Sequence, residues 1–286
     1  MALNEPVYIE SFKKGLLKKK AEAAWDILKS CVLCPRKCGV DRQSGETGVC
    51  KTGMNALVSS YNPHFGEEAP LVGSHGSGTI FFTHCNLLCI FCQNFDISHQ
   101  GYGEEISNEQ LADLMLQLQN LGCHNINFVT PTHIVPHILK ALEVAVKEGL
   151  SVPLVYNSSA YDSVETLRIL EGVFDIYMPD FKFWSSDVGD FEIDESGIAR
   201  RGLLIRHLVL PANFSGTQDV LRFIAQKVSS NSYVNIMPQY RPCGRASEIE
   251  ALCENLSSDD YEKALQMAKS EGITRLDMPR RVFMVR

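Results

Sequence analysis

The chain has 286 residues, 45% of them hydrophobic, and 27 Lys and Arg against 34 Asp and Glu give a formal net charge of -7. This length and apolar content suffice for a sizeable core and exclude disordered and collagen-like chains. The negative charge disfavours nucleic acid as a partner, and no apolar run reaches the roughly 18 residues of a membrane span. No apolar leader follows Met1, so we expect a cytoplasmic protein, in which the ten cysteines indicate metal ligands or buried thiols rather than disulfides.

The first predicted element is a helix over residues 10–30, which ends at a cysteine-rich segment. This segment is rich in Pro and Gly and carries Cys31, Cys34, Cys38 and Cys50. So short a segment cannot bury a core, and we expect a bound metal or cluster to cross-link it. Four thiolates suit zinc and an iron–sulfur cluster equally well. We therefore expect an N-terminal helix and four-cysteine metal-binding module in residues 1–57, followed by a core domain in residues 58–286.

Strands and helices alternate along the core domain. Short apolar or β-branched runs predict strands over residues 79–83, 125–129, 153–156, 175–178, 205–210 and 233–237. Apolar residues at helical spacing predict helices over residues 108–121, 133–147, 163–170, 218–228 and 259–270, whereas residues 184–201 have no clear pattern. Six β/α units predict an α/β fold with one parallel sheet covered by helices, two units short of a complete barrel.

Polar side chains recur where these strands end, which is the edge of a parallel sheet that carries the chemistry. Any one of them taken alone is best explained as a turn or capping residue, but all of them at one edge favour a functional site. They are Thr130, Thr132 and His133 after the second strand, Asn157 after the third, Asp180 and Lys182 after the fourth, Arg206 in the fifth and Gln239 after the sixth.

The first strand leads into three cysteines on one loop, Cys85, Cys89 and Cys92. Thiolates are soft ligands that suit zinc or iron–sulfur clusters. Three thiolates on a four-iron cluster leave one iron free to bind a substrate or cofactor, as the open position of a catalytic metal centre does. The alternative is a zinc ion with His84 or His99 as its fourth ligand.

The CxxxCxxC spacing after the first strand, with Phe91 just before the last cysteine, resembles the signature of the radical S-adenosylmethionine (SAM) superfamily. The resemblance implies a partial (β/α)6 TIM-type barrel and a [4Fe-4S] cluster whose unique iron is chelated by the amino and carboxylate groups of SAM. In that superfamily an electron from the cluster cleaves SAM to methionine and a 5′-deoxyadenosyl radical, which takes a hydrogen atom from the substrate.

Further motifs are similar to those of glycyl-radical activating enzymes, and most of all to the iron–sulfur proteins related to the pyruvate formate-lyase activating enzyme. The resemblance covers about residues 30–275 and includes the CxxCPRxCGV…GxC block of Cys31–Cys50. Where the activating enzymes have a GGE motif, this chain has Thr130-Pro131-Thr132-His133, and no two-cluster ferredoxin domain follows Cys92. The other matching segments are Cys92-Gln93-Asn94-Phe95-Asp96, Asp180-Phe181-Lys182, Arg206-His207-Leu208-Val209-Leu210-Pro211 and Met237-Pro238-Gln239-Tyr240.

The resemblance implies an oxidoreductase with the following roles. Cys85, Cys89 and Cys92 would hold the [4Fe-4S] cluster, and Asp180, Lys182 and Arg206 would act at the reaction centre. An electron donor such as flavodoxin or ferredoxin and a glycyl-radical protein are the expected partners. The alternatives are a radical enzyme acting on a small molecule or peptide, and a metal-binding interaction protein without catalysis. The expected SAM-binding residues are Phe91, Asn94, Thr130, Thr132, Asn157 and Asp180.

Overall fold

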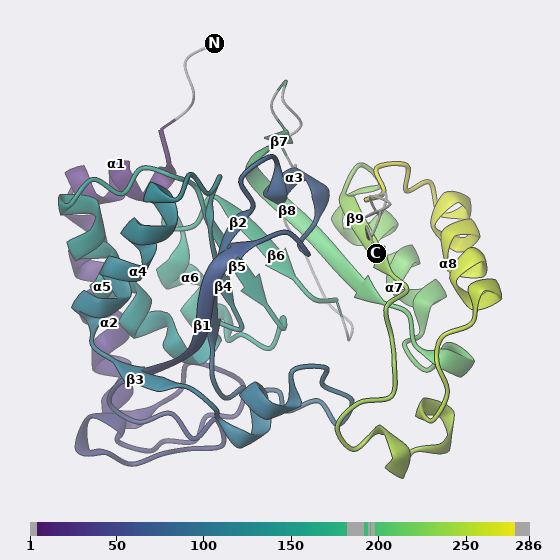
Figure 1. Cartoon of the computed structure of the whole chain (residues 1–286), viewed down its shortest axis with the longest axis horizontal. Helices are drawn as coiled ribbons and strands as arrows, with labels where there is room; N and C mark the ends of the chain where they lie inside the picture. The colour runs from purple at the N-terminus through teal and green to yellow at the C-terminus, as the bar shows by residue number, and fades with distance from the viewer. Residues whose placement is uncertain (1–4, 182–191, 194, 196–197, 278–286) are drawn as a thin grey trace.

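Six parallel strands form the centre of the computed structural model, which describes residues 5–181, 192–193, 195 and 198–277 (Figure 1). The predicted alternation of strands and helices in a mixed α/β fold is confirmed, and neighbouring strands in this order hydrogen-bond in parallel. Within the described ranges β9 pairs along its length with β8, and no ladder closes the sheet onto β2. The strands are β2 (Ser77–Phe82), β4 (Ile126–Val129), β5 (Leu154–Ser158), β6 (Ile176–Pro179), β8 (Ala199–Leu208) and β9 (Tyr233–Met237).

Three further strands extend this sheet and were not predicted. β1 (Ala56–His64) and β3 (Glu104–Ile106) add antiparallel to the β2 edge, and β7 (Glu192–Ile193) pairs antiparallel with β8. The end of β1 is polar and contains Pro63, which lacks a donor and is normally confined to edges or bulges. The segment is therefore a strand through its pairing with β2 rather than through its own sequence pattern.

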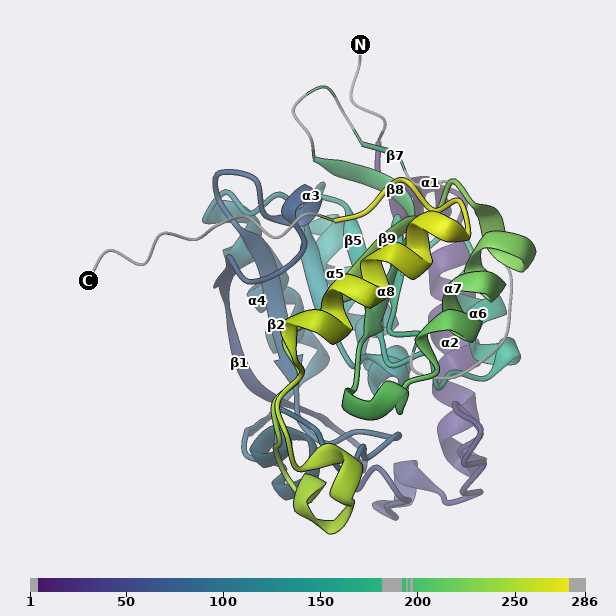
Figure 2. The same cartoon turned by 90° about the vertical axis from the view of Figure 1, so that its right-hand side faces the viewer.

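Helices pack on the outer face of the sheet, as both views show (Figures 1 and 2). α2 and α4 pack against α5, while α7 packs against α8 at the other end of the sheet. α3 lies on the opposite, inner face, where its Leu71 packs against Val155, Ile176 and Leu204. The helices are α1 (Val7–Lys13), α2 (Leu16–Ile27), α3 (Ala69–Val72), α4 (Asn108–Asn120), α5 (Val135–Lys147), α6 (Val164–Leu170), α7 (Thr217–Phe223) and α8 (Ser258–Ser270). Short 3₁₀ turns occupy Leu28–Ser30, Arg42–Ser44, Thr132–Ile134, Pro211–Asn213, Ala246–Glu248 and Glu250–Leu252, and π-helical turns occupy Asp96–Gln100 and Ile224–Ser229.

The predicted single helix over residues 10–30 is wrong. It is two helices, and the second begins after Gly15, whose φ of 68° is left-handed. Glycine adopts this conformation without a steric penalty, which allows the chain to turn between α1 and α2. Both helices join the core of the sheet, because the buried Tyr8 and Leu17 belong to the same hydrophobic cluster as Phe128.

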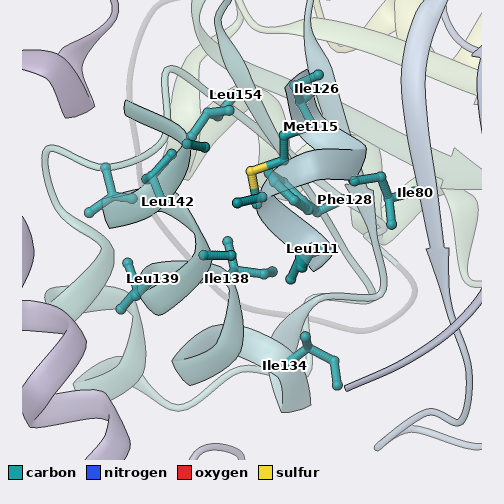
Figure 3. Close-up of a cluster of buried hydrophobic side chains, with 14 of the residues drawn as sticks. Ile80, Leu111, Met115, Ile126, Phe128, Ile134, Ile138, Leu139, Leu142 and Leu154 are labelled. Carbon is teal, nitrogen blue, oxygen red and sulfur yellow. The ribbon is translucent and has the colours of Figure 1, made fainter. Parts of the chain in front are cut away.

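The outer face of the sheet is almost wholly apolar. Ile80, Ile126, Phe128 and Leu154 point from alternate strand positions toward α4 and α5, and all four are fully buried (Figure 3). Successive strand residues point to opposite faces, so the residues between them face the inner side of the sheet, where polar residues such as Asn127 lie. None of the helices in the described part of the chain is long and apolar enough to cross a membrane.

Candidate functional site

A cavity of about 240 Å³ lies at the carboxyl ends of the parallel strands. Its walls come from the cysteine loop after β2 and from the ends of β4, β5, β6, β8 and β9. The polar residues predicted at the strand ends therefore line one cavity, although they come from segments far apart in the sequence. The predicted site residues that line it are Cys85, Cys89, Phe91, Cys92, Asn94, Thr130, Asn157, Asp180, Arg206 and Gln239.

The cysteine loop bends sharply and turns its sulfur atoms toward hydrogen-bond donors. Leu88 has a φ of 60°, an uncommon left-handed conformation for a non-glycine residue. The Leu87 N–H donates to Cys85 Sγ over 3.3 Å, and the Ser98 hydroxyl donates to Cys92 Sγ over 3.2 Å. Donors directed at sulfur stabilise thiolates, so the loop fits a group bound through its cysteines.

Cys85, Cys89 and Cys92 line one cavity, and three thiolates fit the donor set of an iron–sulfur cluster. The predicted zinc ligand His84 also lines the cavity, whereas the alternative, His99, stacks on Phe95 with the ring centroids 4.1 Å apart.

The segment that follows β9 supports the cysteine loop from the side. The Gln93 side-chain amide donates to the Gln239 carbonyl over 2.7 Å, and the Arg245 N–H donates to the Ile90 carbonyl over 2.8 Å. Phe91, predicted to contact adenine, lines the cavity and also meets Tyr240 edge to face at 6.1 Å. These contacts hold the loop at a defined position over the strand ends.

Arg206 connects three strands at the cavity wall. Its Nε donates to Asp180 Oδ1 over 2.7 Å, and its Nη2 donates to Asn157 Oδ1, also over 2.7 Å. Its side chain is 16% exposed, so its charge is held in a largely desolvated position. The sequence predicted all three residues as site residues, and the fold brings them into one hydrogen-bonded group.

Two further acidic residues reach Arg206 and were not predicted. Glu67 and Glu68 precede α3, and their carboxylates lie 3.6 and 3.8 Å from Arg206 Nη1, with side chains 8% and 3% exposed. Asn235 donates to Glu68 Oε1 over 2.8 Å. Burial and the neighbouring Glu68 raise the pKa of Glu67 to about 7, although Arg206 opposes the shift. Two adjacent glutamates in a loop carry no periodic signal, so sequence patterns gave no reason to select them.

Charge balance determines the protonation of Arg206. Burial disfavours its charged form, but Asp180, Glu68 and Glu67 outweigh that effect and raise the pKa of the guanidinium. Arg206 therefore remains a cation with carboxylates on two sides. These partners hold the planar guanidinium in a fixed orientation.

Two residues after β4, Thr132 and His133, are not among the residues that line this cavity. The Thr132 hydroxyl donates to Asp162 Oδ1 over 2.6 Å, and His133 Nε2 lies 3.0 Å from the Thr83 carbonyl. Burial lowers the pKa of His133 to about 3, so it is neutral near pH 7. Thr130 does line the cavity, with a left-handed φ of 55°. Backbone strain of this kind concentrates at functional sites. Lys182 lies outside the described residues.

The four N-terminal cysteines line a second, very small cavity of about 10 Å³. A Cβ at Gly48 would lie 2.7 Å from Cys38 Sγ, so only glycine lets the chain pass this close to the thiol. Four thiolates around one space fit the donor set of zinc or of an iron–sulfur cluster.

Comparison with known proteins agrees with the geometry of the cavity. Residues 79–192 match the radical SAM superfamily. An uncharacterized protein of Methanocaldococcus jannaschii, MJ0674, is 35% identical over 285 residues, which cover 93% of this chain and 82% of that protein. The chain belongs to the same family as this archaeal protein and contains a radical SAM superfamily domain. This superfamily implies a [4Fe-4S] cluster and SAM as cofactors.

Proposed function

We propose that this radical SAM protein holds a [4Fe-4S] cluster through Cys85, Cys89 and Cys92, binds SAM in the adjoining cavity and abstracts a hydrogen atom from a substrate. The observation that carries the proposal is that the three cysteines share one cavity with polar residues from the ends of five parallel strands. When bound, the cluster and SAM supply a reductively generated 5′-deoxyadenosyl radical.

The residues of the chain orient the cofactor. Arg206, Asp180 and Asn157 form one hydrogen-bonded polar group at the cavity wall, and this group would position the amino acid part of SAM. Phe91 offers an aromatic face to adenine, while Thr130 and Asn94 add polar contacts at the rim. Cys85 and Cys92 accept hydrogen bonds that favour their thiolate forms.

For the substrate, we propose activation of a glycyl-radical protein, supported by the motif resemblance from Cys92 to Tyr240. Flavodoxin or ferredoxin is the proposed electron donor. Radical chemistry on a small molecule or peptide is the alternative. Transfer of deuterium into 5′-deoxyadenosine from a labelled candidate partner protein, or from a labelled small molecule, distinguishes the two.

The test of the enzymatic proposal is release of 5′-deoxyadenosine from SAM by the anaerobically reconstituted, dithionite-reduced protein. We expect Cys89→Ala to reduce product formation to background, because one cluster ligand is lost. Cys253→Ala is the matched control, since this exposed cysteine is not among those lining either cavity, and it should behave as wild type. No product from wild type, or equal product from both variants, contradicts the proposal and favours a non-catalytic metal-binding protein.

A further inference from the structure

The loop that carries the four N-terminal cysteines lies beside the loop that carries Cys85, Cys89 and Cys92. The loop of residues 31–50 and the loop after β2 both lie along the lower edge in Figure 1. Asn86, which stands between Cys85 and Cys89, also lines the cavity of the four N-terminal cysteines. The N-terminal module therefore packs directly on the loop that carries the three cysteines.

Arg36, which lies between Cys34 and Cys38, makes the closest link. Its Nε donates to the Asn86 carbonyl over 3.0 Å, and its Nη2 donates to the Leu87 carbonyl over 3.1 Å. The guanidinium also lies over the Tyr161 ring, 5.4 Å from the centroid. Two hydrogen bonds and a cation–π contact hold this side chain in one orientation.

One peptide group carries the effect of Arg36 to a predicted cluster ligand. The Asn86–Leu87 peptide accepts from Arg36 at its carbonyl and donates from its N–H to Cys85 Sγ. A cation at the carbonyl polarises the peptide and strengthens the bond that its N–H donates. Hydrogen bonds to the sulfurs are among the factors that set the reduction potential of an iron–sulfur cluster.

The Asn86 side chain supplies a second link, made through the buried interior. This residue is fully buried, and its Nδ2 donates to the Tyr161 carbonyl over 2.7 Å. Asn86 Oδ1 has no hydrogen-bond partner among the described residues. Asn86 therefore joins the cysteine loop both to the cavity of the N-terminal cysteines and to Tyr161.

We propose that a metal bound by Cys31, Cys34, Cys38 and Cys50 organises Arg36, and that Arg36 then positions the Asn86–Leu87 peptide against Cys85 and raises the reduction potential of the cluster. The inference rests on the proposed function, because it assumes a cluster at the cysteine loop. Arg36 is a positioning residue that touches neither SAM nor substrate. The reduced cluster carries one more negative charge, so the strengthened hydrogen bond and the nearby cation both favour reduction.

The test is the midpoint potential of the cluster, measured by EPR-monitored redox titration together with the iron and zinc content per chain. We expect Arg36→Ala to shift the potential to more negative values while iron at the cysteine loop is retained. Arg36→Lys, which keeps the charge without the planar fork, should give a smaller shift in the same direction. It also provides the readout if Arg36→Ala does not retain iron.

The matched control is Arg245→Ala. Arg245 contacts the same cysteine loop through its backbone N–H, but its side chain pairs with Glu248. Losing this charge should leave the potential unchanged if the peptide contact, rather than nearby positive charge in general, is responsible.

Metal dependence is tested with Cys34→Ser. This variant should lose the N-terminal metal, shift the potential as Arg36→Ala does, and give no further shift when the two substitutions are combined. An unchanged potential in Arg36→Ala and Arg36→Lys overturns the inference, as does a Cys34→Ser protein that lacks the metal but keeps the wild-type potential. If the wild-type protein assembles no cluster at Cys85, Cys89 and Cys92, the proposed function itself fails, which is a distinguishable result.

Discussion

The two faces of the parallel sheet differ in what they contribute, although they alternate along the same strands. On the outer face Ile126, Phe128 and Leu154 bury apolar side chains under α4 and α5. On the inner face Asn157, Arg206 and Asn235 form polar contacts with one another or with acidic residues. The stabilisation from apolar burial is non-directional and insensitive to pH. The contacts on the inner face depend instead on the charge of each group and on the position of its partner. Stability of the outer face and chemistry of the inner face can therefore be altered separately.

The largest effect is expected from Arg206→Met, which removes the guanidinium shared by Glu67, Glu68 and Asp180. Losing one partner of a buried ionic group costs about 3–5 kcal/mol, and SAM binding should be lost as well. Lower pH allows the carboxyls to protonate, so the cost should be smaller at pH 5 than at pH 8. Denaturant unfolding at both pH values measures this difference, and a cost independent of pH would contradict the ionic interpretation.

A comparable change on the outer face is Leu154→Ala. Leu154 is fully buried, and truncation of a buried leucine costs about 2–5 kcal/mol. The truncation removes apolar atoms only and keeps the backbone N–H that donates to Asp175 Oδ2, so the loss in unfolding free energy should be the same at pH 5 and pH 8. SAM affinity of the folded variant, measured by calorimetry, should match that of wild type. If the folded variant binds SAM more weakly than wild type, the two faces of the sheet cannot be altered separately.

A smaller, pH-dependent effect is expected from Glu67→Gln. The pKa of Glu67 is raised to about 7 from 4.5, so the native state holds the proton more tightly than the unfolded chain. The contribution of this proton to the free energy of unfolding is fully present below about pH 4.5. It is lost as the pH rises to about 7, at about 1.4 kcal/mol per pKa unit. Glutamine resembles the protonated form, so the variant should gain stability relative to wild type across this window and keep that advantage above it.

Unfolding curves of wild type and Glu67→Gln between pH 4.5 and 8 provide the measurement. Glu254→Gln is the control, because Glu254 is exposed, and its stability difference from wild type should not change with pH. If the stability difference between Glu67→Gln and wild type is also independent of pH, the native protein does not retain this proton.

The sequence by itself determined that three thiolates lie on one loop and that parallel strands form the centre of the sheet. The spacing of Cys85, Cys89 and Cys92 places three thiolates on one loop whatever surrounds them, because neighbours in the chain stay close in space. The alternation of apolar strands and amphipathic helices likewise predicted the parallel sheet, since its signals are local. Strand ends meet at one edge of such a sheet, so Asn157, Asp180 and Arg206 could also be placed near the site.

Only the tertiary structure decided which distant side chains meet. Glu67 and Glu68 reach Arg206 because α3 packs on the inner face of the sheet, and Arg36 reaches the Asn86–Leu87 peptide because the N-terminal module packs on the cysteine loop. Thr132 and His133 do not line the cavity, because they belong to a 3₁₀ turn in which they contact Asp162 and the Thr83 carbonyl. Such contacts depend on how separate elements pack, which neither residue spacing nor periodicity encodes.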